Sequence, residues 1–279
     1  MQRRRQIVQI ASEDVLLHPS LSVGEICDKI RYSRLITNNL SLSRDEQPLE
    51  KSLYSDGVFI DSERVFKLFE DGASIILRGA HKYFPSLDDL MRKIQRPWHC
   101  DCQVNLYLSR PEVNATYPHF DPHELFIFQL HGTKVWKIYE SKYIFPQVGD
   151  GYDKDRHGHG GLVRNYELLE GDVLFLPRGA IHQPVAKTSS IHVSVGLMPL
   201  SRAYVLSRLI EVMAELDTEF RELALQGSSS ENSSMVLKKL LARTSDFLEE
   251  SSKSTLFFAS LEQELPEIGE DLTRFFERQ

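Results

Sequence analysis

The sequence predicts a mainly β fold with flanking helices, in which an antiparallel sandwich or barrel such as a jelly roll occupies residues 101–200. Two observations support this. Segments rich in β-branched and aromatic residues follow one another at short intervals in this region, separated by turn signals. The residues before it mix helical and strand patterns, and those after it are helical. We therefore expect an N-terminal α/β cap at 1–100, a β core at 101–200 and a C-terminal helical region at 201–279.

The cap region combines helices with short strands. Apolar residues recur at helical spacing in 22–30, and Ser86 is the expected N-cap of an amphipathic helix at 86–94. Short strands are expected at 57–61 and 74–78.

The core region shows a period of two residues, as half-buried strands do. The expected strands are Val104–Ser109, Leu125–Leu130, Lys134–Tyr139, Val173–Leu176 and Ile191–Val195. Gly132 marks a hairpin turn between the second and the third of these strands.

The C-terminal region is helical and acidic. Apolar residues spaced three or four apart in 206–223 form one face of a helix, and the Ser-rich stretch 226–234 is typical of a flexible linker. Residues 201–279 hold nine Lys and Arg against fifteen Asp and Glu, a net charge of −6. This region is either a solvated helical appendage or a dimerisation element.

Composition excludes several classes of protein. The chain has 279 residues, with 33 Lys and Arg against 40 Asp and Glu, and a net charge of −7. An acidic balance argues against nucleic-acid binding, and no apolar stretch is long enough to span a membrane. Three cysteines cannot form a disulfide framework, and the N-terminus is a poor signal peptide, so we expect a cytoplasmic protein.

Three residues of the core region form a candidate metal site. His119 and Asp121 are two positions apart, so both side chains of an extended segment point to the same face. His182 follows a strand and a Pro-Arg-Gly turn, where a barrel presents side chains at its mouth. Two imidazoles and a carboxylate make up the facial triad of non-haem Fe(II) oxygenases, which leaves coordination positions open for a 2-oxo acid and dioxygen.

Lys134 begins the strand that returns after Gly132, and alternation places it on one face with Trp136 and Ile138. A lysine that points into an interior requires an anion, because an unpaired buried charge is costly. The distal carboxylate of 2-oxoglutarate would supply that anion. The alternative is a lysine on a solvated outer face.

These residues, in the block from Val104 to Gly196, resemble a JmjC domain of the cupin superfamily, a group of Fe(II)- and 2-oxoglutarate-dependent oxygenases, and are most similar to ribosomal-oxygenase-like cupins. The resemblance implies a double-stranded β-helix in which His119, Asp121 and His182 bind iron and Lys134 binds the co-substrate. It also implies a co-substrate role for Thr116, Asn105 and Tyr107. Leu125 stands where the asparaginyl-hydroxylase branch carries asparagine, so that reaction is not predicted.

The expected reaction is hydroxylation of an unactivated C–H bond, coupled to conversion of 2-oxoglutarate and O2 to succinate and CO2. A protein or peptide side chain is the leading substrate class, followed by a small molecule of a biosynthetic pathway and by N-methyl-lysine. A metal-binding cupin without oxygenase activity and an interaction protein built around the acidic tail are the rival classes. A homodimer through the C-terminal helices is a further expectation. We expect His192 to contact the site residues without binding the metal, and Trp136 to pack against other side chains.

Overall fold

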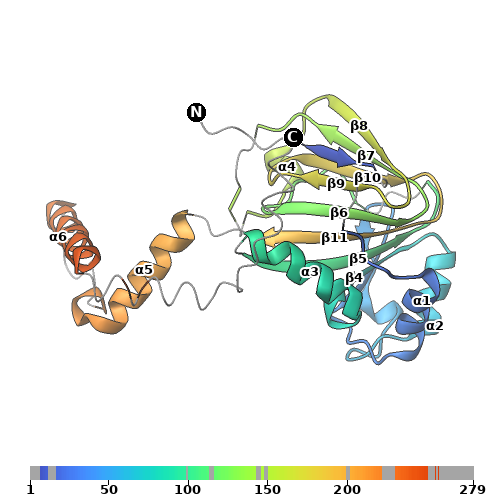
Figure 1. Cartoon of the computed structure of the whole chain (residues 1–279), viewed down its shortest axis with the longest axis horizontal. Coiled ribbons are helices and arrows are strands. Elements are labelled where there is room, and N and C mark those ends of the chain that lie inside the picture. Colours follow the sequence, from blue (N-terminus) through green and yellow to red (C-terminus); the bar gives the residue numbers. More distant parts are fainter. Residues whose placement is uncertain are drawn as a thin grey trace. The chain divides into compact units, whose positions relative to one another are not determined.

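The computed structural model describes residues 7–11, 17–98, 100–112, 116–142, 146–147, 150–198, 202–221, 230–250, 255 and 257. The chain divides into two compact units, one of Met1–Pro199 with Glu270–Gln279 and the other of Leu200–Gly269. Figure 1 labels the elements of both units. Among the described residues, no helix is long and apolar enough to cross a membrane.

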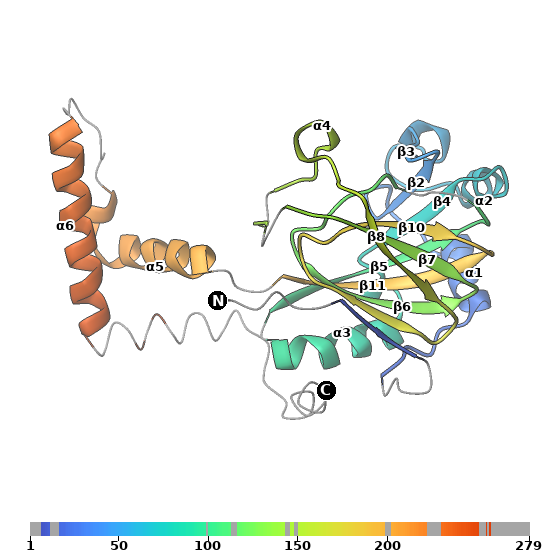
Figure 2. The same ribbon diagram turned by 90° about the horizontal axis from the view of Figure 1, so that it is seen from above.

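The first unit is built on two antiparallel sheets (Figures 1 and 2). The strands of the larger sheet are β1 (Val8–Ile10), β2 (Leu40–Arg44), β3 (Gln47–Pro48), β4 (Ser74–Arg78), β5 (Asp101–Ser109), β6 (Glu124–His131), β9 (Val173–Leu176) and β11 (Ser190–Met198). Their spatial order is β1-β9-β6-β11-β5-β4-β2-β3. The strands of the smaller sheet are β7 (Lys134–Tyr139), β8 (Leu162–Leu168) and β10 (Ile181–Ala186), and β7 lies in its centre.

Helices of the first unit begin at residues suited to a helix N-terminus. They are α1 (Val23–Tyr32), α2 (Ser62–Glu70), α3 (Pro85–Trp98) and the short α4 (Lys154–His157). Ser22 and Glu25 form a capping box at α1, in which the Glu25 backbone N–H donates to Ser22 Oγ at 3.2 Å. Asp61 caps α2 by accepting hydrogen bonds from two backbone N–H groups of its first turn.

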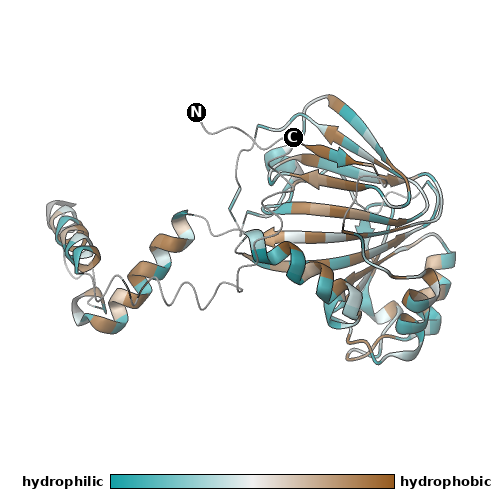
Figure 3. Cartoon of the chain, viewed as in Figure 1, coloured by the Kyte–Doolittle hydropathy of each residue, from teal (hydrophilic) through white to brown (hydrophobic). Residues whose placement is uncertain are grey.

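Alternation along the strands separates an apolar outer core from the space between the sheets, and Figure 3 shows the resulting change of hydropathy from residue to residue. Val104, Leu106 and Leu108 of β5 belong to the same buried cluster as the apolar residues of α3. Leu125 and Ile127 of β6 instead pack with residues of the smaller sheet in a second cluster. Buried polar residues of the two sheets, among them Lys134, His182 and His192, form the site described below.

The five expected core strands are confirmed by β5, β6, β7, β9 and β11, the strand at 74–78 by β4, and the helix at 22–30 by α1. The hairpin expected at Gly132 is wrong, because β6 lies in the larger sheet and β7 in the smaller one, where β7 pairs with β8 and β10. The strand expected at 57–61 is wrong: Phe59 and Ile60 make only isolated bridges, and Asp61 caps α2. Ser86 is not an N-cap, because α3 already begins at Pro85, a residue favoured in the first helical position.

Strands from before residue 100 take part in the larger sheet, since β4 pairs with β5 and β1 pairs with β9. The division of a cap at 1–100 from a core at 101–200 remains a prediction.

The second unit contains α5 (Arg202–Leu216), a 3-10 turn (Thr218–Arg221) and α6 (Ser230–Glu249). Its buried residues are Leu209, Met213, Phe247 and Phe257. The linker expected at 226–234 is wrong for 230–234, which are helical, and 226–229 lie outside the described residues. Several large apolar side chains of the two helices remain exposed: Tyr204, Leu206, Ile210, Leu216, Met235, Leu237, Leu241 and Leu248.

Candidate metal centre

His119 and His182 are held side by side by backbone hydrogen bonds. The His119 N–H donates to the His182 carbonyl at 3.0 Å, and the His182 N–H donates to the His119 carbonyl at 2.8 Å. The Gly179 N–H donates to the Asp121 carbonyl at 3.0 Å. The segment that carries the first two predicted ligands is therefore fixed against β10 and the turn before it, which carry the third.

The three predicted ligands converge on one point. One potential ligand atom of each of His119, Asp121 and His182 lies within 4.8 Å of the others, and His182 Nε2 is 3.6 Å from Asp121 Oδ2. Two nitrogens and one oxygen at this spacing can bind a single ion. This donor set suits first-row divalent metals that accept mixed nitrogen and oxygen ligands, Fe(II) among them.

Both imidazoles are oriented by their own backbone. His119 Nδ1 is 2.9 Å from the Tyr117 carbonyl, and His182 Nδ1 is 2.9 Å from the Ala180 carbonyl. A carbonyl oxygen only accepts hydrogen bonds, so we assign the proton of each neutral ring to Nδ1. Nε2 of each ring then keeps its lone pair for a metal, as in protein metal sites where a hydrogen bond fixes the histidine tautomer.

The charge states of these groups also favour a cation. Burial and the neighbouring His119 lower the pKa of His182 to about 4, so the ring is neutral near pH 7. Burial by itself would raise the pKa of Asp121. The electrostatic effect of the neighbouring imidazoles of His119 and His182 is larger, so the pKa of Asp121 is lowered. Near pH 7 the site therefore presents the neutral His182 ring and the Asp121 carboxylate to a cation.

Lys134 is buried inside the barrel, at 2% exposure. Its Nζ donates to Ser109 Oγ at 3.1 Å and to His192 Nδ1 at 3.0 Å. Burial lowers the pKa of the Lys134 ammonium to about 7 and holds the pKa of His192 well below its usual value. Ser109 and His192 are both neutral, so this lysine can still pair with an anion.

The other three predicted co-substrate residues have different surroundings. Tyr107 stacks on His192 with ring centroids 4.5 Å apart, and burial together with the Asp121 carboxylate raises the pKa of its phenol. Asn105 Oδ1 accepts a hydrogen bond from the Gly79 N–H at 3.3 Å, so the amide oxygen of Asn105 is already used in a bond within the protein. Thr116 Oγ1 is buried and has no hydrogen-bond partner within the described part of the chain.

Comparison with known proteins identifies the domain. Residues 79–204 match the model of the JmjC domain. The chain contains a JmjC domain. One similar protein is the bifunctional lysine-specific demethylase and histidyl-hydroxylase NO66 of Drosophila pseudoobscura pseudoobscura, 28% identical over 186 residues, or 66% of this chain and 20% of that protein. NO66 of Drosophila melanogaster is 29% identical over 174 residues, or 60% of this chain and 26% of that protein. The chain therefore spans only about a fifth to a quarter of the length of these two curated relatives.

The fold of the JmjC domain also has solved counterparts. A structure of YcfD, a ribosomal oxygenase from Escherichia coli, in complex with cobalt and succinic acid has a TM-score of 0.61 at 16% identity, covering 92% of this chain and 67% of that one. A second structure of YcfD, with cobalt and 2-oxoglutarate, has a TM-score of 0.59 at 16% identity, covering 94% and 68%. These likenesses confirm the mainly β architecture with flanking helices.

Sequence reasoning missed the hydrogen-bond partners of Lys134 in the JmjC domain. The sequence assigns no role to Ser109, the last residue of an expected strand, and predicts for His192 only a supporting position beside the site. Alternation could have found both, because Ser109 shares a face with Asn105 and Tyr107, and His192 pairs with Tyr107 across β5 and β11.

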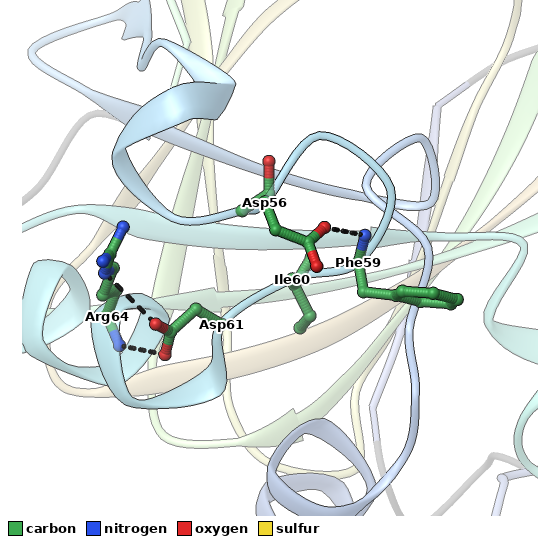
Figure 4. Close-up of a pocket in the computed structure, with 6 residues that line it drawn as sticks. Asp56, Phe59, Ile60, Asp61 and Arg64 are labelled. Carbon is green, nitrogen blue, oxygen red and sulfur yellow. Dashed lines mark hydrogen bonds and ion pairs between the residues drawn. The ribbon is translucent and has the colours of Figure 1, made fainter.

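A surface pocket of the same unit lies over α2 and the turn before it, and Figure 4 shows polar and apolar residues that line it. Asp56 Oδ1 accepts from the Phe59 N–H at 2.7 Å, and Arg64 Nε lies 3.1 Å from Asp61 Oδ2. The pocket's acids therefore already bond to neighbouring residues of the pocket. None of the predicted site residues lines it, so it is separate from the metal centre.

Proposed function

We propose that this protein is an Fe(II)- and 2-oxoglutarate-dependent oxygenase that hydroxylates an unactivated C–H bond of a protein side chain. The observation that carries the proposal is the combination of a converged His-Asp-His group with an inward lysine on the neighbouring strand. A metal site alone would also suit an isomerase or a sensor. The buried lysine, once protonated, adds a requirement for an acidic ligand, which 2-oxoglutarate meets.

His119, Asp121 and His182 would hold the iron through two Nε2 atoms and one carboxylate oxygen. The metal, when bound, supplies the oxidising power for dioxygen activation, which no side chain provides. The chain's own contribution is to fix the orientation of the ligand rings through the Tyr117 and Ala180 carbonyls.

Lys134 would bind the distal carboxylate of 2-oxoglutarate. Ser109 and His192 hold its ammonium in place from two sides, so little side-chain freedom remains to be lost on binding. We assign supporting contacts to the Thr116 hydroxyl, which is buried without a partner among the described residues, and to Asn105 and Tyr107.

A protein side chain is the proposed substrate because the similar proteins are named as histidyl-hydroxylases and lysine demethylases. Histidyl hydroxylation is the first reaction to test. Demethylation of N-methyl-lysine and oxidation of a small molecule are the alternatives.

The proposal is tested by anaerobic titration of the Fe(II)-loaded protein with 2-oxoglutarate, followed by admission of O2 and measurement of succinate. A weak visible absorption band of the metal chelate and succinate formation are expected. Metal binding without either signal would favour a cupin without oxygenase activity. Histidine-containing and N-methyl-lysine peptides then separate the two protein reactions, since hydroxylation adds one oxygen atom and demethylation releases formaldehyde.

We further propose that the second unit forms a homodimer contact, since α5 and α6 expose Leu206 and Leu241 at 60% and 61%. A cytoplasmic setting is proposed as well, because Cys27, Cys100 and Cys102 are all free thiols.

A further inference from the structure

We propose that the indole N–H of Trp136 is a co-substrate-binding group, which donates a hydrogen bond to an oxygen of the dicarboxylate held between the metal centre and Lys134. This inference rests on the proposed function. It assigns to Trp136 a role beyond the packing expected from the sequence.

Trp136 lies in the middle of the inner row of β7. Lys134, Trp136 and Ile138 are the buried positions of this strand, and they pair with Ala186, Pro184 and His182 of β10 in that order. The strand pairing thus places the lysine at one end of the row and a metal ligand at the other. Trp136 occupies the interval between them.

Contacts of the indole ring agree with this position. Its centroid is 5.6 Å from that of His182, a metal ligand, and 5.3 Å from that of His192, whose Nδ1 accepts from Lys134. The ring of His192 stands nearly perpendicular to the indole, at 87°. A molecule that touches both the metal and the Lys134 ammonium therefore passes beside Trp136.

The polar atom of this ring lacks a partner in the protein. Trp136 is 3% exposed, and its Nε1 is buried with no hydrogen-bond acceptor among the residues that the structure describes. Buried indole N–H groups usually find a partner, because leaving a buried donor unpaired is costly. Indole nitrogen can only donate, and the oxygens of an ionised dicarboxylate can only accept. The chemistry of the two groups is complementary.

The experiment replaces Trp136 by β-(3-benzothienyl)alanine, in which sulfur takes the place of the N–H and the ring size is kept. Trp136→Phe is the second variant, and Trp98→Phe is the matched control, since Trp98 packs against Phe126 and Phe175 in the outer core. The dissociation constants of Mn²⁺, and of 2-oxoglutarate for the Mn²⁺-loaded protein, are measured without O2 by calorimetry.

We expect the benzothienyl protein to bind 2-oxoglutarate about tenfold more weakly than the wild type, as loss of a charge-assisted hydrogen bond implies, with Mn²⁺ affinity unchanged. The Trp98→Phe protein should match the wild type in both. Equal 2-oxoglutarate affinity of the benzothienyl and wild-type proteins would overturn the inference and leave the proposed function standing. Failure of the Mn²⁺-loaded wild type to bind 2-oxoglutarate would overturn both. A parallel loss of Mn²⁺ affinity in the benzothienyl protein would mean that the ring supports the metal ligands, which also overturns the inference.

Discussion

Replacing Lys134 by methionine should have opposite effects on stability and on co-substrate binding. The methionine side chain has a similar length but no charge. In the folded protein, burial lowers the pKa of Lys134 from 10.5 to about 7. At about 1.36 kcal/mol per pKa unit, this drop corresponds to a folding penalty of roughly 5 kcal/mol, fully present below pH 7.

Removing the lysine also removes the hydrogen bonds to Ser109 and His192. Ser109 Oγ still accepts from Ser74 Oγ at 3.4 Å, so His192 Nδ1 is the one acceptor left without its donor, and an unpaired buried acceptor costs about 1–3 kcal/mol. The balance favours the variant, so the free energy of unfolding of the metal-free protein should rise by about 2 kcal/mol at pH 7. The unfolded chain binds more protons than the folded chain between about pH 7 and 10.5, so the penalty in the wild type disappears as pH rises through this window. The advantage of the variant should disappear with it.

Binding of 2-oxoglutarate should change in the other direction. Truncating one partner of a buried charge pair costs about 2–5 kcal/mol, so the dissociation constant should rise at least about thirtyfold. Chemical denaturation of the metal-free protein and anaerobic calorimetry of the Mn²⁺-loaded protein measure the two effects. Lys137→Met is the matched control, because Lys137 lies on the same strand with its side chain on the opposite face. A variant that loses stability and keeps its 2-oxoglutarate affinity would show that Lys134 serves the fold and refute this reasoning.

Three further predictions concern the metal centre, the pH dependence and the second unit. Replacing any one of the three predicted metal ligands by alanine should weaken Mn²⁺ binding and abolish succinate formation; the variants are His119→Ala, Asp121→Ala and His182→Ala. His131→Ala is the control, because His131 lies on the surface beside Glu170, and it should change neither property. Succinate formation by a metal-loaded ligand variant would contradict the assignment. The affinity for 2-oxoglutarate should fall as pH rises above about 7, because Lys134 must then take up a proton; a pH-independent dissociation constant between pH 6 and 9 would contradict this. Leu206→Glu together with Leu241→Glu should convert a dimer to a monomer in sedimentation without loss of uncoupled 2-oxoglutarate turnover, and a wild type that sediments only as a monomer would refute the dimer.

The inward position of Lys134 could be predicted because side chains alternate between the two faces of a strand. Gly132 has a φ of 66°, and a Cβ atom at this residue would lie 2.0 Å from the Ser189 carbonyl oxygen, so the turn requires glycine. This turn carries the chain from the larger sheet to the smaller one, and alternation along β7 then places Lys134, Trp136 and Ile138 in the buried row. The same alternation puts His119 and Asp121 on one face, which is why the metal ligands could be read from spacing.

The parts that sequence reasoning missed depend on distant or edge strands. β10 contains Pro184, which lacks the N–H of a central strand and weakens the pattern, and β10 is an edge strand, where proline is tolerated. His192 acquires its partner from β7, 58 residues earlier, and only the closure of the two sheets brings them together. No local pattern distinguishes such a histidine from one buried for packing.

The charges of the site explain why a lysine with a lowered pKa suits this position. A divalent ion beside Asp121 and two neutral histidines leaves an excess of positive charge, and a permanently charged lysine would increase that excess before the co-substrate arrives. A neutral Lys134 avoids this cost in the absence of 2-oxoglutarate. When the dicarboxylate binds, the ion and a protonated Lys134 together carry three positive charges. These balance the one negative charge of Asp121 and the two negative charges of 2-oxoglutarate. Burial of Lys134 against neutral partners therefore couples its protonation to co-substrate binding, whereas an arginine, which stays charged at all accessible pH values, would not.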